Sequence, residues 1–85
     1  MVGMRATVHT PYYDWDGRKY FELEAQGKVL RVKVPFRYGR VMCKVTGLKT
    51  VQEFQKGDQV EVTIGTKTWD GEKYLVLESI AEIEA

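Results

Sequence analysis

Hydrophobic and polar residues alternate along most of this chain, with the period of two that is typical of half-buried β-strands. Val60, Val62 and Ile64, for example, are separated by single polar residues. Valine, threonine, tyrosine and isoleucine, which favour strands, are abundant, and turn-forming glycines recur at intervals of roughly ten residues. Helical periodicity is absent, apart from a short turn around residues 50–55. We therefore expect an all-β protein built from several short strands.

An internal repeat marks two of the turns. Residues 15–24 align with residues 69–78 at an offset of 54, and seven of the ten positions are identical. Each copy contains Asp-Gly between alternating residues, and Asp-Gly readily takes the positive-φ conformations of a type I′ turn. A single repeat of this length is too short for a solenoid. We interpret the two copies as similar hairpins within one small barrel.

Turn positions determine which residues of neighbouring strands face each other. A turn at Asp16-Gly17 places Tyr12 opposite Phe21, Thr10 opposite Leu23 and Val8 opposite Ala25 on one face, and Tyr13 opposite Tyr20 and Trp15 opposite Arg18 on the other. A second turn, at Gln26-Gly27, pairs Phe21 with Val32, Leu23 with Leu30, Glu22 with Arg31 and Tyr20 with Lys33. Both turns assign the same inward face to residues 18–25, whereas a slip of one residue would reverse every side chain.

The remaining strands are predicted from the same alternation. A turn at Tyr38-Gly39 followed by a strand at 40–46 places Phe36 opposite Val41 and Val34 opposite Cys43, all inward. Residues 48–55 then hold a short turn or helix, and whether 36–50 is a strand or a helix stays open. Val60, Val62 and Ile64 point inward from the next strand. The last strand runs from Lys73 to about Glu82 with Leu75 and Leu77 inward, and a bulge near Ser79 restores the alternation.

Length and composition confine the chain to one small domain, residues 1–85. No run of about 18 apolar residues is present to cross a membrane, and the N-terminus lacks the apolar stretch of a signal peptide. Cys43 is the single cysteine, so no internal disulfide forms, and we expect a reduced, intracellular protein of the cytoplasm. One histidine and one cysteine also exclude a Cys/His zinc site.

The predicted barrel resembles the oligonucleotide/oligosaccharide-binding (OB) fold, a five-stranded Greek-key barrel. The resemblance lies in the hairpin at residues 15–20, the segment 54–62 and the hairpin at 69–74, and it covers nearly the whole chain. In that fold the loops joining strands 1–2 and 4–5 flank the ligand groove, and the two Trp-Asp-Gly hairpins fall in those places. The resemblance implies an OB-like Greek-key barrel of five or six strands. An extra strand in place of the usual helix between strands 3 and 4 leaves an SH3-like small barrel as the alternative.

Charge is distributed unevenly along the chain. The formal net charge is +1, but residues 28–49 contain seven lysines and arginines and no acidic residue. These 22 residues carry +7, so the other 63 carry −6. A nearly neutral protein with this pattern presents one basic face.

Aromatic rings accompany these cations on the outward face of the predicted hairpins. Cations that follow phosphates and rings that stack on bases are what single-stranded nucleic-acid binding requires. Glu22 faces Arg31 and would partly cancel its charge, whereas Lys33, Arg37 and Arg40 lack an acidic partner in the predicted register. The candidate nucleic-acid-binding residues are Tyr13, Trp15, Arg18, Tyr20, Arg31, Lys33, Arg37, Tyr38, Arg40 and Trp69. Structural roles are the alternative for the rings, as a cross-strand pair or as plugs at the barrel end.

We expect single-stranded nucleic-acid binding with little sequence specificity, DNA slightly favoured over RNA, in a replication or repair accessory role by analogy with other small free-standing barrels. Enzyme activity is not expected, and no catalytic residue, metal site or cofactor is predicted. His9 is the only histidine, and no phosphate-cradling glycine loop occurs. The alternative function is a protein–protein interaction barrel within a larger complex, whose basic segment meets an acidic partner. A homodimer or another protein partner stays open, and no membrane association is expected.

Overall fold

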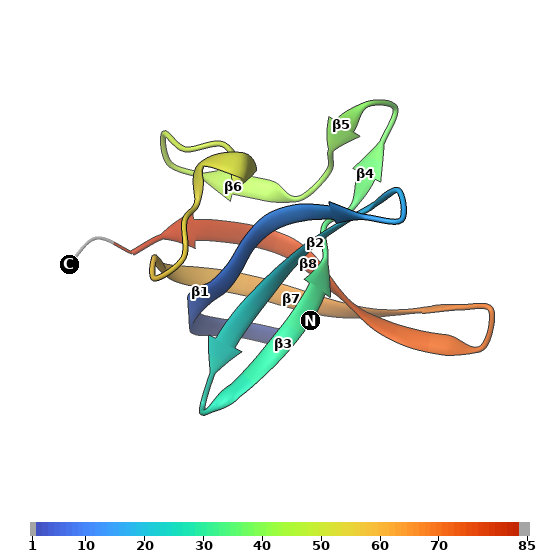
Figure 1. Cartoon of the computed structure of the whole chain (residues 1–85), viewed down its shortest axis with the longest axis horizontal. Helices are drawn as coiled ribbons and strands as arrows, with labels where there is room; N and C mark the ends of the chain where they lie inside the picture. Colours follow the sequence, from blue (N-terminus) through green and yellow to red (C-terminus); the bar gives the residue numbers. More distant parts are fainter. Residues whose placement is uncertain (1, 84–85) are drawn as a thin grey trace.

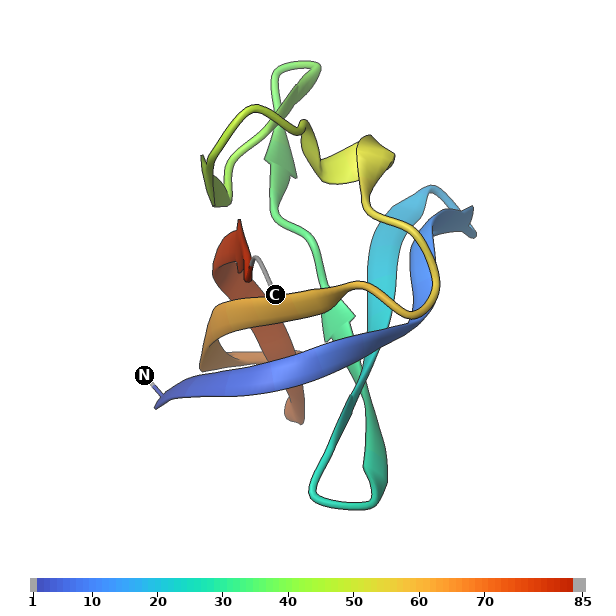
Figure 2. The ribbon, with the colours of Figure 1, turned by 90° about the vertical axis from the view of Figure 1, so that its left-hand side faces the viewer.

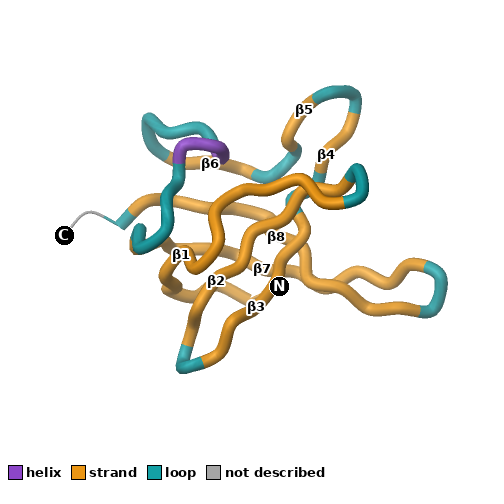
Figure 3. Tube along the Cα trace, viewed as in Figure 1, coloured by secondary structure: helices purple, strands orange, loops and turns teal. Residues whose placement is uncertain are grey.

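Eight strands and one short helical turn make up residues 2–83, the part of the chain that the computed structural model describes (Figure 1). The elements are β1 (Val2–Trp15), β2 (Arg18–Ala25), β3 (Lys28–Lys33), β4 (Phe36–Arg37), β5 (Arg40–Val41), β6 (Lys44–Thr46), the 3₁₀ turn η1 (Val51–Glu53), β7 (Gln59–Trp69) and β8 (Glu72–Glu82). Figure 3 shows how strands dominate the trace. Within residues 2–83 no helix has the length and apolar character needed to cross a membrane. The predicted all-β class is confirmed.

Five of the strands close into a barrel. β1 pairs antiparallel with β2 and β7, β2 pairs with β3, and β7 pairs with β8. A parallel pair, Lys33 with Val76, joins β3 to β8 and closes the ring, while the short β6 lies along the other half of β8. In Figure 2 the β4–β5 hairpin and the β2–β3 turn extend from opposite ends of this barrel. The strand order is compatible with an OB-like Greek key.

Inward-facing positions of the alternating strands form the core. Phe21, Leu23, Val32 and Leu77 are completely buried, and they come from β2, β3 and β8. Burying a side chain of this size contributes roughly 1.5–3 kcal/mol relative to leaving it in water. The alternation in the sequence therefore determines which face of each strand points into the barrel.

The two hairpins predicted at the N-terminal end are present. The β2–β3 pairing about Gln26-Gly27 is confirmed at all four predicted pairs. The β1–β2 turn at Asp16-Gly17 is confirmed as well, with φ of 56° and 73° at its two central residues, which a type I′ turn requires.

Farther from that turn, the predicted β1–β2 register is wrong. Val8 faces Leu23 instead of Ala25, and Thr10 faces Glu22 instead of Leu23, because two irregularities interrupt β1 between Val8 and Tyr13. Pro11 lies in this segment and has no N–H to donate to a ladder, so regular pairing cannot run through it. The irregularities turn Thr10 outward while Val8 stays buried.

Residues 36–46 form two short structures instead of the single predicted strand at 40–46. β4 and β5 make a small hairpin about Tyr38-Gly39, and β6 separately pairs with β8. Cys43 is buried as expected, but Phe36 is 47% exposed, so its predicted core position is wrong. The hairpin projects from the barrel (Figure 1), and its two-residue strands leave part of the Phe36 ring in solvent, with the Lys19 ammonium 5.3 Å from the ring centroid.

The β7–β8 hairpin reaches beyond the barrel and positions the candidate site. A bulge at Glu78, between the pairs Thr63–Ser79 and Ile64–Leu77, confirms the irregularity expected near Ser79. Past it, residues 66–73 are exposed on a two-stranded arm that extends to the side (Figure 1). Its Asp70-Gly71 turn has φ of 51° and 79°, as in the first hairpin.

Candidate functional site

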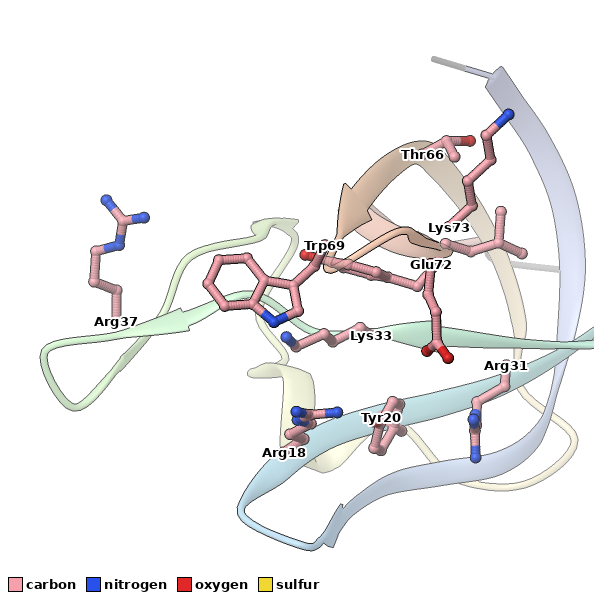
Figure 4. Close-up of a pocket in the computed structure, with 11 residues that line it drawn as sticks. Arg18, Tyr20, Arg31, Lys33, Arg37, Thr66, Trp69, Glu72 and Lys73 are labelled. Atoms are coloured by element: carbon pink, nitrogen blue, oxygen red, sulfur yellow. The ribbon is translucent and has the colours of Figure 1, made fainter.

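A groove opens where β3 and β8 diverge. Among the described residues the two strands pair at Lys33 and Val76 alone, and towards their N-terminal ends they separate because β8 begins on the projecting arm. The groove has a volume of about 830 Å³ and receives side chains from both Asp-Gly hairpins and from β3 and β4 (Figure 4). Its lining residues are Arg18, Tyr20, Arg31, Lys33, Arg37, Thr66, Trp69, Glu72, Lys73, Tyr74 and Leu75.

The groove is strongly cationic. Five lysines and arginines line it, against Glu72 as the single carboxylate, which leaves four positive charges in excess. None of these five cations forms an ion pair among the described residues, where ion pairs involve His9, Lys19 and Lys49 instead. The positive charge of the groove can therefore attract an anionic ligand.

Lys49 belongs to the basic segment 28–49 but not to this groove. It is paired with Asp58, at 3.2 Å, and with Glu82. These two carboxylates raise the pKa of Lys49 above its ordinary value. These ion pairs therefore connect the loop before η1 to the turn that precedes β7 and to the end of β8.

Aromatic rings pack against one another on the outer face of β1 and β2. The ring of Tyr20 lies 5.6 Å from that of Tyr13 and 6.2 Å from that of Trp15. The guanidinium of Arg31 covers the cluster, 4.9 Å from the Tyr20 centroid and 5.3 Å from the Trp15 centroid. As a result Tyr20 is only 8% exposed, although Trp15 is 57% exposed.

Glu22 faces Arg31 across the strands, as predicted, but the two side chains form no ion pair in the described structure. Glu22 instead accepts a hydrogen bond from the Tyr13 hydroxyl at 2.8 Å. Burial, together with this hydrogen bond, raises the pKa of Tyr13 above its ordinary value. The positive charge of Arg31 is thus held against aromatic rings at the groove rather than neutralised by a carboxylate.

Trp69 is the most exposed ring of the groove. It is 71% exposed and lies on the arm, with no other ring and no cation packed on it among the described residues. Figure 4 shows it above Lys33 and on the opposite side of the groove from Tyr20. Tyr74 lines the same groove from β8, with the ammonium of Lys33 5.0 Å from its ring centroid. A flat ligand can therefore reach Trp69 without displacing a side chain.

The ten residues predicted for nucleic-acid binding are distributed over three places. Six of them line the groove: Arg18, Tyr20, Arg31, Lys33, Arg37 and Trp69. Tyr13 and Trp15 lie next to it in the aromatic cluster under Arg31. Tyr38 and Arg40 are exposed at the β4–β5 hairpin and do not line the groove.

Residues from the second copy of the repeat were missed by the sequence prediction. Lys73 and Tyr74 line the groove, and they correspond to Lys19 and Tyr20 at the offset of 54. The repeat therefore indicates Tyr74, because its counterpart Tyr20 is among the candidate residues, and it indicates position 72 through Arg18 although the residue there is Glu72. Thr66 and Leu75 also line the groove, and no sequence signal points to them as binding residues.

Groups suited to other chemistry are few in the described structure. No cluster of three His, Cys, Asp or Glu side chains that could hold a metal ion occurs within residues 2–83. Burial raises the pKa of the Cys43 thiol to about 11, so it is protonated at neutral pH, and a protonated thiol is a poor nucleophile.

Comparison with protein families, with curated proteins and with solved structures gave no match to this chain.

Proposed function

We propose that this protein binds single-stranded nucleic acid in the groove between β3 and β8, with little sequence specificity, and that its barrel is of the OB kind. The strand order supports the second part, because β1 pairs with both β2 and β7 while β3 and β8 close the ring in parallel. The two Asp-Gly hairpins correspond to the loops that flank the ligand in such barrels. Arg18 from one hairpin and Trp69 from the other line the same groove.

The excess of unpaired cations along one groove is the observation that carries the proposal. Five lysines and arginines that form no ion pair within residues 2–83 provide a track for a polyanion. Contacts of this type go to phosphates, which repeat regularly along a strand whatever its bases. The groove therefore favours affinity over sequence discrimination.

Trp69 supplies the stacking surface in this proposal. Its ring is exposed beside the cations, and every base has a π-face that can stack on it, at roughly 1–3 kcal/mol per base. Bases in a duplex are already stacked and paired inside the helix. A site that combines an exposed ring with phosphate-binding cations is consequently expected to prefer a single strand.

Trp15 has a secondary role. Arg31 lies against the Trp15 ring at 5.3 Å, so a base reaches that ring only where the guanidinium moves away. Since Trp69 has no such cover, replacement of Trp69 is expected to weaken binding more than replacement of Trp15.

A titration of fluorescently labelled oligonucleotides tests the proposal. Single-stranded DNA, single-stranded RNA and a duplex of the same sequence are added at about 50 mM and about 200 mM salt. We expect both single strands to bind more tightly than the duplex, with affinity falling steeply as salt rises. The tryptophans offer a second readout, because a stacked base quenches their emission.

Trp69→Ala and Trp15→Ala form a matched pair of variants. Trp69→Ala is expected to weaken binding about 5- to 150-fold, the equivalent of roughly 1–3 kcal/mol, with the salt dependence unchanged because an indole carries no charge. If the unaltered protein binds no oligonucleotide at low salt, the proposal is wrong, and the protein-interaction alternative is favoured.

A further inference from the structure

A second cleft adjoins the groove on the side of the β4–β5 hairpin. Its volume is about 360 Å³, and it shares Lys33, Arg37 and Tyr74 with the groove. The ammonium of Lys33, 5.0 Å from the Tyr74 centroid, belongs to the lining of both spaces. The two spaces therefore adjoin, one lined from the arm of β7 and β8 and the other from the hairpin of β4 and β5.

The walls of this cleft combine cations with exposed apolar surface. Lys67 adds a third cation to the shared Lys33 and Arg37, and no carboxylate of the described residues lines the cleft. Met42, at 56% exposure, supplies most of the apolar part. Phe36 adds the part of its ring that is left exposed, 47% of the residue, with the Lys19 ammonium 5.3 Å from the ring centroid. Lys67 forms no ion pair among the described residues. Apolar surface next to unpaired cations matches a nucleotide, which has a flat base and an anionic phosphate.

We infer that this cleft is a second nucleotide-binding subsite, which receives the continuation of the strand held in the groove. The inference rests on the proposed function. A base packs against Phe36 and Met42, and Lys67 contacts a phosphate of that segment. Charge complementarity and the shared residues support this occupant, because every charged residue that lines the cleft in the described structure is cationic and the cleft shares three residues with the cationic groove. The β4–β5 hairpin, which lies outside the closed barrel, thereby lengthens the binding path.

Oligonucleotide length separates the two subsites experimentally. Oligothymidylates of about four and about twelve nucleotides lie within the range of site sizes, about 4–16 nucleotides, seen for such barrels. Lys67→Ala is expected to reduce the salt slope for the long oligonucleotide by about 0.7, the value of one phosphate contact on a single strand, and to leave the slope for the short one unchanged. Lys56→Ala is the matched control, because Lys56 is exposed and lines neither space. It should change neither slope.

Met42→Ala tests the apolar wall, with Leu48→Ala as its control. Leu48 is fully exposed and lines neither space. We expect Met42→Ala to weaken binding of the long oligonucleotide severalfold and to leave the short one and the far-ultraviolet circular dichroism unchanged. Lys67→Ala acting equally on both lengths, or on neither, overturns the second subsite while the groove stands. Absence of single-strand binding by the unaltered protein overturns the groove and the subsite together.

Discussion

The salt dependence of binding offers a quantitative test of the groove. Five lysines and arginines line it, and none of them is ion-paired in the part of the chain that the structure describes. If each contacts one phosphate, at about 0.7 per contact on a single strand, the plot of log affinity against log salt has a slope of about −3.5. Affinity then falls about 100-fold between about 50 mM and about 200 mM salt.

Replacing Lys33 and Arg37 by alanine removes two of these contacts. The slope is expected to become about −2.1, so that the same change in salt weakens binding only about 20-fold. Adding Arg40→Ala to this double variant should leave the slope where it is. Arg40 lies at the β4–β5 hairpin and outside the groove, although it belongs to the same basic segment of the sequence.

Fluorescence anisotropy at four or five salt concentrations measures these slopes. The control is Arg5→Ala combined with Lys56→Ala, which removes two exposed cations that do not line the groove and therefore causes the same change in net charge. Equal slopes for the control and for the Lys33/Arg37 variant would mean that binding follows net charge and not this groove. The reasoning from groove geometry would then be refuted.

Three further predictions concern the barrel itself. Cys43 should react with thiol reagents only on unfolding, because it is 8% exposed and burial raises its pKa to about 11; rapid labelling of the native protein would contradict the buried placement. Leu77→Ala should lower the free energy of unfolding by about 2–5 kcal/mol in urea denaturation, since the side chain is completely buried, whereas the exposed Leu48→Ala should change it by less than about 0.5 kcal/mol. Stability should fall as the pH drops below about 4, because a hydrogen bond from the Gln55 backbone N–H, aided by Lys49, holds the pKa of Asp58 below its ordinary value. A group of this kind contributes its full stabilisation above its unfolded pKa and loses it progressively as the pH falls through its folded pKa. Asp58→Asn should flatten this acid limb of the stability curve, and an unchanged limb would show that Asp58 is not its cause.

Local sequence pattern was sufficient to predict the hairpins. Asp-Gly and Gln-Gly turns admit few backbone conformations, and alternation along β2 and β3 leaves one register that buries Phe21 and Leu23. The same pattern did not predict how β1 pairs with β2 on the N-terminal side of Tyr13. There Pro11 interrupts the ladder, and pairing depends on how a 14-residue strand bends from one neighbour to the next.

The composition of the candidate site depended on the fold as a whole. A charge count over residues 28–49 treats Lys33, Arg40 and Lys49 alike, yet the structure places the first in the groove, the second on a projecting hairpin and the third in ion pairs with Asp58 and Glu82. Trp69 and Lys33 line one groove only because β3 and β8 close the barrel at one pair and then separate. Alternation and turn chemistry act over a few neighbouring residues, so they determine strands and faces. Which side chains share a groove is decided by the pairing of strands that are distant in the chain.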